Sequence, residues 1–328
     1  MPVFELPLEE LWKYQGRNPK PADFDDYWKR ALAELKGIDP DVKRIPAPFQ
    51  SEVAECFDLY FTGVRGARVH AQYLRPKKRN KPCPTLFRFH GYGGNSGDWY
   101  EKLGFVGEGF CVCAMDVRGQ GGKSTETGNV VGNILKGHII RGLDDEPDNL
   151  LYRHIFLDTV QLVNIVSDFE EVDEQRLGAY GMSQGGALTL ACAGLHPQIK
   201  KLAPMCPFLC DYKRVWEMDL ALEAYEELRT YFRLFDPRHE RENEIFTKLG
   251  YIDCQFLAER IQGEVLMAIG LMDQICPPST QFSAFNKIKS KKEAVIYPDF
   301  AHEIYPGFTD KMFEFFRKDW IETNEKSK

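Results

Sequence analysis

The distribution of apolar residues predicts a chain that alternates between short buried strands and amphipathic helices. Segments 55–63 and 67–76 alternate apolar and polar residues, as antiparallel strands with one solvated face do. Segments 85–94 and 110–121 are instead short apolar runs that end in glycine-rich turns. Such runs are typical of strands buried in a mostly parallel sheet.

Helices and strands continue to alternate through the second half of the chain. We predict helices and strands in this order: helix 150–169, strand 175–181, helix 184–195, strand 201–206, strand 264–270, helix 279–290, strand 293–298 and helix 309–322. This order implies right-handed crossovers and a doubly wound, mostly parallel sheet with helices on both faces. We therefore predict an α/β fold in which residues 1–328 form a single domain.

Three regions fall outside this regular alternation. Residues 1–50 form an N-terminal extension, with one clear helix over 23–35 that begins with acidic residues. The stretch 119–149 is polar, rich in glycine and without periodicity, and it is too long for an ordinary connection. We predict that it is an interface loop. Residues 207–261 show helical periodicity and are predicted to form a cap over the strand ends.

Composition and charge narrow the class of protein. The chain is 43% hydrophobic, but no segment approaches the roughly 18 uninterrupted apolar residues that cross a membrane. The N-terminus carries acids early and does not look like a secretory signal. A net charge of −7 without a long basic run argues against nucleic acid as a partner. The nine cysteines include no CxxC pair, so we expect free thiols in a cytoplasmic protein.

A glycine-rich turn in mid-chain carries the first sign of chemistry. The sequence Gly181-Met-Ser-Gln-Gly185 matches the nucleophile-elbow pattern G-x-S-x-G, with a predicted strand before it and a predicted helix after it. The glycines let the chain turn sharply, which places Ser183 in a strained conformation. The bare pattern is frequent by chance, and a turn without catalytic function is the alternative.

A serine hydroxyl needs a general base to become a nucleophile. In the order of the hydrolase triad, the histidine follows the serine and the acid. Two histidines lie far enough beyond Ser183. His239 falls in a charged helical start, where a solvent-facing position is expected. His302 follows the last predicted strand, from which a loop can carry its imidazole to the strand ends, and we choose it as the base.

The acid that orients the base should follow the penultimate strand. Asp273 comes three residues after Gly270, where that strand is predicted to end. Asp253 and Asp299 are the competing candidates. Asp253 is better explained as the N-cap of a helix, and Asp299 as a residue that shapes the loop of His302. Asp273 is therefore the predicted acid.

The tetrahedral intermediate of such a reaction needs preorganised N–H donors for its oxyanion. The backbone N–H of Gln184, directly after the nucleophile, is one candidate. The other is the N–H of Tyr92 in the turn His90-Gly-Tyr-Gly-Gly94. We interpret the His90 side chain as a hydrogen-bonded structural group. All these pieces follow predicted strands, at the edge where open α/β sheets place their sites.

Longer motifs extend over nearly the whole chain. They are LEELWKYQGRNPKPADFDDYW, RFHGYGG, MDVRGQGGKS, HIIRGLDDEPDNLLYRHIFLDTV, YGMSQGGALTLACAGL, GLMDQICPPST and AHE. Together they resemble the acetyl xylan esterase/cephalosporin C deacetylase family, which is carbohydrate esterase family seven. Ala187 and Ala301 depart from that pattern, because glycine is expected there in many members.

The resemblance implies an α/β-hydrolase fold and the same site as the residues do. It makes Ser183 the nucleophile, His302 the base and Asp273 the acid, with the amides of Tyr92 and Gln184 as the oxyanion hole. It further implies an acyl pocket lined by Tyr92, Phe208 and Ile275.

The resemblance also implies an activity and an assembly. The expected reaction is deacetylation of short acetylated xylo-oligosaccharides and of cephalosporin C-type acetyl esters through an acetyl-enzyme, with neither metal nor cofactor. The expected assembly is a cytoplasmic homohexamer, a trimer of dimers, with the 119–149 loop in the dimer contact. Two alternatives remain open: a broad-specificity short-chain carboxylesterase or other serine hydrolase of this fold, and a catalytically inactive member that serves as a binding protein.

Overall fold

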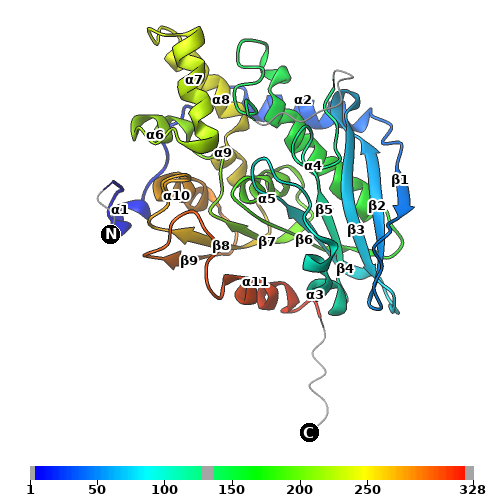
Figure 1. Cartoon of the computed structure of the whole chain (residues 1–328). Coiled ribbons are helices and arrows are strands. Elements are labelled where there is room, and N and C mark those ends of the chain that lie inside the picture. Colours follow the sequence, from blue (N-terminus) through cyan, green and yellow to red (C-terminus); the bar gives the residue numbers. More distant parts are fainter. Residues whose placement is uncertain (1–3, 128–135, 322–328) are drawn as a thin grey trace.

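A nine-stranded sheet organises the part of the chain that the computed structural model describes, residues 4–127 and 136–321. The strand order is β1-β2-β3-β5-β4-β6-β7-β8-β9 (Figure 1). The strands are β1 (Lys43–Pro46), β2 (Ala54–Thr62), β3 (Arg68–Pro76), β4 (Cys83–Phe89), β5 (Cys111–Met115), β6 (Val172–Met182), β7 (Ile199–Met205), β8 (Glu264–Gly270) and β9 (Lys292–Tyr297).

The sheet has an antiparallel and a parallel part, as the apolar patterns predicted. The pairs β1–β2, β2–β3 and β3–β5 are antiparallel, whereas the pairs from β5 through β4 and β6 to β9 are parallel. Strand β5 is fully buried. Strand β1 was not predicted, because its four residues are all exposed and carry no periodic signal. Its basic residues and proline suit an unpaired sheet edge.

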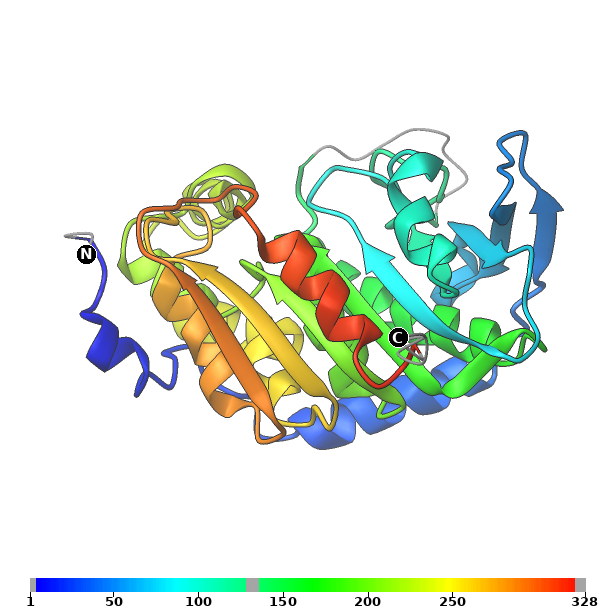
Figure 2. The same ribbon diagram turned by 90° about the horizontal axis from the view of Figure 1, so that it is seen from below.

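Helices cover both faces of the sheet (Figures 1 and 2). Helices α3 and α11 lie on one face, where their apolar residues form a core with those of β4 and β5. Helices α2, α4, α5 and α10 pack on the other face, which holds the larger core. The helices are α1 (Leu8–Leu11), α2 (Phe24–Lys36), α3 (Leu103–Gly107), α4 (Leu151–Ser167), α5 (Gln184–Leu195), α6 (Tyr212–Glu217), α7 (Glu226–Phe235), α8 (Glu242–Leu249), α9 (Cys254–Ala258), α10 (Pro278–Lys287) and α11 (Phe308–Arg317).

One predicted helix boundary differs from the structure. The last helix ends at Arg317 rather than at residue 322, because Lys318 leaves the helical conformation and Asp319 has a φ of +65°. Residue 322 itself lies outside the described residues. The region 207–261 is helical, as predicted, and holds the α-helices α6 to α9, with residues of positive φ such as Asp219 and His239 between them.

The structure tests some of the other sequence predictions and leaves others untested. All nine cysteines are buried free thiols, as predicted. Within residues 4–127 and 136–321, no helix combines the length and the apolar character that membrane spanning requires. Part of the predicted interface loop, residues 128–135, lies outside the described residues, as do 1–3 and 322–328 of the predicted domain. The roles of interface loop and cap stay predictions.

Candidate functional site

The turn between β6 and α5 places Ser183 in a strained backbone conformation. Its φ and ψ are 58° and −118°, a combination that side chains other than glycine rarely adopt. Three backbone hydrogen bonds hold it there. The Ser183 N–H donates to the Met205 carbonyl at 3.0 Å, and its own carbonyl accepts from Ala187 and Phe208, both at 3.0 Å. The nucleophile-elbow geometry predicted from the motif is therefore present.

The glycines of the motif are required by close packing against the end of β4. A Cβ atom on Gly181 would lie 2.5 Å from the carbonyl oxygen of Phe89, and one on Gly185 would clash with the same oxygen. Because neither glycine carries a Cβ, the β6–α5 turn sits directly beside the loop that follows β4. The predicted nucleophile and the predicted oxyanion loop thus become neighbours.

The structure brings together the three side chains predicted as a triad. The His302 Nε2 atom lies 3.0 Å from the Ser183 Oγ, and its Nδ1 atom lies 2.8 Å from the Asp273 Oδ2. Asp273 is fully buried, and its Oδ1 accepts the N–H groups of Ile275 and Cys276 at 2.9 and 2.8 Å. This arrangement can deprotonate the serine hydroxyl and stabilise the resulting imidazolium.

The surroundings of His302 set the direction of its pKa shift. Burial by itself lowers the pKa of His302, whereas Cys276 and the hydrogen-bonded Asp273 raise it, and the net direction is upward. Because burial raises the pKa of the Cys276 thiol to about 12, that thiol is neutral at pH 7. The Asp273 carboxylate is therefore the charged partner that favours the protonated imidazole.

The competing candidates lie elsewhere. His239 packs against the Trp216 ring, with ring centroids 5.4 Å apart, in the helical region after β7. Asp253 is the N-cap of α9 and accepts the Gln255 N–H at 3.1 Å, as predicted. Asp299 is exposed in the loop after β9. The structure therefore places only Asp273 and His302 beside the nucleophile among the acids and bases considered from the sequence.

A pair of glutamine side chains connects the two predicted oxyanion donors. The Gln120 Nε2 donates to the Gln184 Oε1 at 2.7 Å, and the Gln184 Nε2 donates back to the Gln120 Oε1 at 3.0 Å. The same Gln120 Oε1 accepts the N–H of Gly93 at 2.9 Å, next to Tyr92. The Gln184 side chain is fully buried and binds the loop of Tyr92 through Gln120.

The histidine at the end of β4 is a structural group, in agreement with the sequence interpretation. His90 is buried, and its Nδ1 lies 2.7 Å from the carbonyl oxygen of Gly91. Its Nε2 accepts the N–H of Val117 at 2.9 Å, so that the ring joins the oxyanion loop to the chain after β5. Burial lowers the pKa of His90, which keeps the ring neutral.

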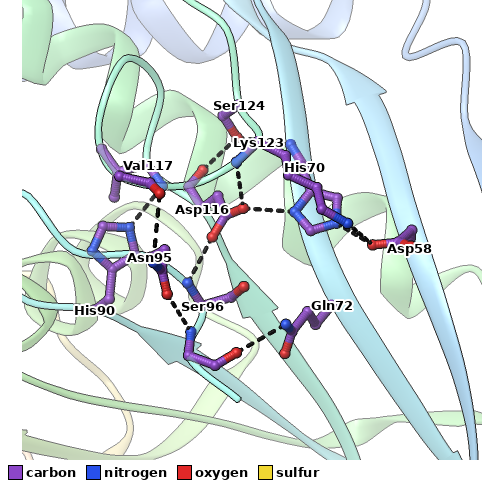
Figure 3. A network of polar contacts seen from close by, with 12 residues as sticks. Asp58, His70, Gln72, His90, Asn95, Ser96, Asp116, Val117, Lys123 and Ser124 are labelled. Carbon is purple, nitrogen blue, oxygen red and sulfur yellow. Dashed lines mark hydrogen bonds and ion pairs between the residues drawn. The ribbon is translucent and has the colours of Figure 1, made fainter. Parts of the chain in front are cut away.

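A buried charged network supports the oxyanion loop from the side of β3 and β5 (Figure 3). Asp116, directly after β5, accepts the N–H groups of Ser96 at 2.6 Å and Lys123 at 2.8 Å. The His70 ring lies between two acids, with Nδ1 2.7 Å from Asp116 and Nε2 2.7 Å from Asp58. The sequence did not predict this network, because its members share no motif and come from β2, β3, the loop after β4 and the segment after β5.

Two of the three residues predicted to line the acyl pocket, Tyr92 and Phe208, contact each other. The rings of Tyr92 and Phe208 meet edge to face, with centroids 5.9 Å apart. The Tyr92 hydroxyl donates to the buried Glu227 of α7 and lies 3.0 Å from the His138 Nδ1. Ile275 is half-buried in the loop after β8. Tyr92 thus joins the loop of the predicted oxyanion hole to the helical region 207–261.

A family model and two similar solved structures point to the same family. The family model described as Acetyl xylan esterase (AXE1) matches residues 1–319. Acetyl xylan esterase 1 from Thermoanaerobacterium sp. JW/SL YS485 is 60% identical with a TM-score of 0.92, over 95% of this chain and 98% of that one. The acetyl xylan esterase from Paenibacillus sp. R4 is 34% identical with a TM-score of 0.89, over 95% of this chain and 99% of that one.

Other relatives are more distant. Acetyl esterase Axe7A from Xylanibacter ruminicola is 27% identical over 302 residues, which cover 88% of this chain and 64% of that protein. The chain thus spans less than two thirds of this curated relative. A Pyrococcus horikoshii acylaminoacyl peptidase, 17% identical with a TM-score of 0.58, shares the fold alone over 84% of this chain and 43% of its own. Together the structural likenesses confirm the predicted α/β-hydrolase fold.

Proposed function

The chain belongs to the acetyl xylan esterase family, and we propose that it is a serine esterase that removes O-acetyl groups from short acetylated xylo-oligosaccharides. Cephalosporin C-type acetyl esters are proposed as further substrates. The observation that carries the proposal is the contact of His302 with both Ser183 Oγ, at 3.0 Å, and Asp273, at 2.8 Å. The names of the two similar solved esterases support the choice of an acetylated xylan substrate.

In the proposed first half-reaction, Ser183 becomes acetylated. Its Oγ attacks the acetyl carbonyl carbon while His302 Nε2 takes the hydroxyl proton. Asp273 accepts the Nδ1–H hydrogen bond and stabilises the imidazolium. The backbone N–H groups of Tyr92 and Gln184 hold the oxyanion. His302 then donates its proton to the sugar oxygen, the C–O bond breaks and the deacetylated alcohol leaves.

In the second half-reaction, water releases acetate. His302 takes a proton from a water molecule, whose oxygen attacks the carbonyl carbon of the acetyl-enzyme. The same two amides hold the second oxyanion, and the proton returns from His302 to the Ser183 oxygen as acetate departs. The cycle as proposed needs neither a metal nor a cofactor.

A small acyl pocket is the proposed basis of selectivity for acetyl esters. We assign its lining to Tyr92, Phe208 and Ile275. Phe208 is fixed in position, because its side chain is buried and its N–H donates to the Ser183 carbonyl. A series of p-nitrophenyl esters with acyl chains of two to eight carbons tests this lining. Activity should be highest with acetate, and a maximum at four carbons or more would favour a broad-specificity carboxylesterase instead.

Replacement of the nucleophile tests the proposal as a whole. Ser183→Ala should abolish both acetate release from acetylated xylo-oligosaccharides and labelling by a fluorophosphonate probe. Ser283→Ala is a matched control, because Ser283 lies in α10 and donates only to the Thr280 carbonyl, at 2.7 Å. Normal p-nitrophenyl acetate hydrolysis by Ser183→Ala would refute the mechanism. If the folded wild-type protein neither hydrolyses these esters nor reacts with the fluorophosphonate probe, the result would favour the alternative that it is a binding protein.

We further propose a cytoplasmic homohexamer, a trimer of dimers, with the 119–149 loop in the dimer contact. Helix α7 projects from the body of the molecule (Figure 1), and Leu234 and Phe235 near its end are 68% and 58% exposed. Such apolar side chains on a projecting helix are suited to a contact between subunits. The molar mass in solution should correspond to six chains, and a monomer would contradict the proposed assembly.

A further inference from the structure

A cysteine lies beside the acid and the base of the proposed triad. Cys206 follows β7, as Asp273 follows β8 and His302 follows β9, so three neighbouring parallel strands bring these side chains to one edge of the sheet. The Cys206 sulfur, a carboxylate oxygen of Asp273 and a ring nitrogen of His302 all lie within 4.8 Å of one another. Across residues 4–127 and 136–321, no other group of His, Cys, Asp or Glu side chains has this compactness.

The backbone holds Cys206 in this position. Its φ is +35°, in the left-handed region that residues other than glycine adopt only when the surrounding structure imposes it. Its N–H donates to the Ala268 carbonyl of β8 at 2.9 Å, and the preceding Met205 carbonyl accepts the N–H of Ser183. The sulfur is therefore positioned by the same strand end that holds the proposed nucleophile.

The three side chains provide the ligand types of a zinc site. Thiolate, imidazole and carboxylate bind Zn²⁺ at about 2.0–2.3 Å, which places neighbouring ligand atoms of a tetrahedral ion about 3.3–3.8 Å apart. The Nδ1–Oδ2 pair of His302 and Asp273, now at 2.8 Å, would open by less than about 1 Å. The most distant pair, at up to 4.8 Å, would close by up to about 1–1.5 Å. Three protein ligands leave the fourth position for water.

An ion can reach these ligands from the solvent-exposed side of His302, the proposed base. The His302 side chain is 19% exposed, whereas Cys206 and Asp273 are fully buried. Coordination by Cys206 forms a metal–sulfur bond and breaks the S–H bond, and the thiol proton passes to solvent. A protonated His302 releases a second proton to solvent when its ring nitrogen binds the ion.

We propose that Cys206, Asp273 and His302 form a binding site for a thiophilic divalent cation such as Zn²⁺, and that its binding reversibly inhibits the esterase. Coordination through Nε2 occupies the lone pair that would accept the Ser183 proton. Coordination through Nδ1 moves the ring proton to Nε2, which can then no longer accept one. The inhibition rests on the proposed function, but the binding of the ion does not.

Binding is tested with Cd²⁺, whose bond to a thiolate gives an ultraviolet charge-transfer band. In wild type and in Ser183→Ala, the band should grow until one equivalent of Cd²⁺ has been added. Cys206→Ser and Cys206→Ala should lack this band. Two Cys206 variants are used so that the loss of one to misfolding leaves the other. Cys192→Ser is the control, because this cysteine is buried in α5, outside the cluster. An undiminished band in a folded Cys206 variant overturns the proposal.

Inhibition is tested with Zn²⁺ during hydrolysis of p-nitrophenyl acetate, as the ratio of rates with and without the ion for each variant. Half-inhibition should need at least about ten times more Zn²⁺ in the Cys206 variants than in wild type or Cys192→Ser, and a chelator should restore activity. Equal sensitivity of all variants overturns the proposal. If Ser183→Ala proves active, the proposed function fails while its Cd²⁺ band still reports on the site.

Discussion

Two Asp–His units with different surroundings lie in the part of the chain that the structure describes. His302 bonds one carboxylate through Nδ1 and the Ser183 hydroxyl through Nε2, and its side chain is 19% exposed. His70 bonds a carboxylate through each nitrogen, at 2.7 Å in both cases, and its side chain is 1% exposed. The second partner and the access to solvent distinguish the two rings.

The second partner decides what each imidazole can do. A serine hydroxyl donates a proton, so the Nε2 lone pair of His302 faces a group that it can deprotonate. The carboxylates of Asp58 and Asp116 only accept, and nearby hydrogen-bond donors lower the pKa of both below the ordinary range despite burial. Each nitrogen of His70 thus faces a carboxylate rather than a hydroxyl, so neither faces a group that it could deprotonate for catalysis. His70 instead connects β2, β3 and the chain after β5.

The largest expected difference between the two units concerns their acids. Asp273→Asn should lower kcat by about 10⁴-fold, because an amide no longer holds His302 in the tautomer that accepts the serine proton. Asp116→Asn should change kcat by less than about tenfold, since Asp116 does not contact the proposed triad, and should instead lower stability. Steady-state kinetics with p-nitrophenyl acetate and a denaturant titration measure the two effects. Equal loss of kcat in both variants would contradict the comparison.

The His70 unit should make its largest contribution to stability. His70→Gln leaves two buried carboxylates without their shared partner and should lower the free energy of unfolding by roughly 3–5 kcal/mol. The double variant Asp58→Asn, His70→Gln removes one of the two charges and should recover part of that loss. Denaturant midpoints measure both changes. A double variant less stable than His70→Gln would show that repulsion between the two acids is not the cause.

Gln120 lies in the segment after Asp116, and its side chain joins the loop of Tyr92 to the elbow, so its replacement should give an intermediate effect. Gln120→Leu breaks the bonds to Gly93 and Gln184, which join the loop of the predicted oxyanion hole to the elbow. Because positioned oxyanion donors contribute about 10²–10³-fold each, we expect a loss of about a hundredfold in kcat. KM should change little, and labelling of Ser183 by a fluorophosphonate probe should slow as well, because that reaction also places a charged oxygen at the oxyanion donors. A loss confined to KM would place Gln120 in ground-state binding instead.

The sequence allowed much of the parallel part of the fold to be predicted, because its strands are apolar runs with glycine-rich ends. The same rule led to the triad residues, since Ser183, Asp273 and His302 each follow a strand in chain order. Strand β1 was missed because its side chains are exposed and show no alternation. The end of α11 was missed because nothing in the apolar pattern announces the turn at Lys318.

The His70 network could not be predicted for a different reason. Asp58, His70 and Asp116 lie on β2, on β3 and after β5, and they meet only because these strands pair in a particular register. A motif records residues at fixed spacing along the chain, whereas this network depends on spacing across the sheet. The role of the Gln120 side chain was missed likewise, although its RGQG motif was noted as part of the family resemblance.

The pH dependence of activity and that of stability should separate the two histidines. The raised pKa of His302 means that the proposed base becomes protonated as the pH falls through a value above its ordinary 6.5, and kcat/KM should fall with it.

The carboxyl group of Asp116 affects the stability of the fold, and it does so in a lower pH range. Burial alone would raise its pKa, but hydrogen bonds from His70 and from the backbone N–H of Lys123 lower it from 3.8 to about 2. Because the pKa of Asp116 is lower in the folded than in the unfolded chain, its ionised carboxylate stabilises the fold at pH values above the unfolded pKa. This contribution, roughly 2 kcal/mol, is lost only as the pH falls from about 4 to about 2.

Near pH 5 the protein should therefore be folded but nearly inactive. Profiles of kcat/KM and of denaturant midpoints against pH check this, and coincident loss of both would mean that unfolding, not protonation of His302, ends activity. In Asp273→Asn, the acid limb of the residual kcat/KM should move to lower pH, because the carboxylate that raises the pKa of His302 is removed.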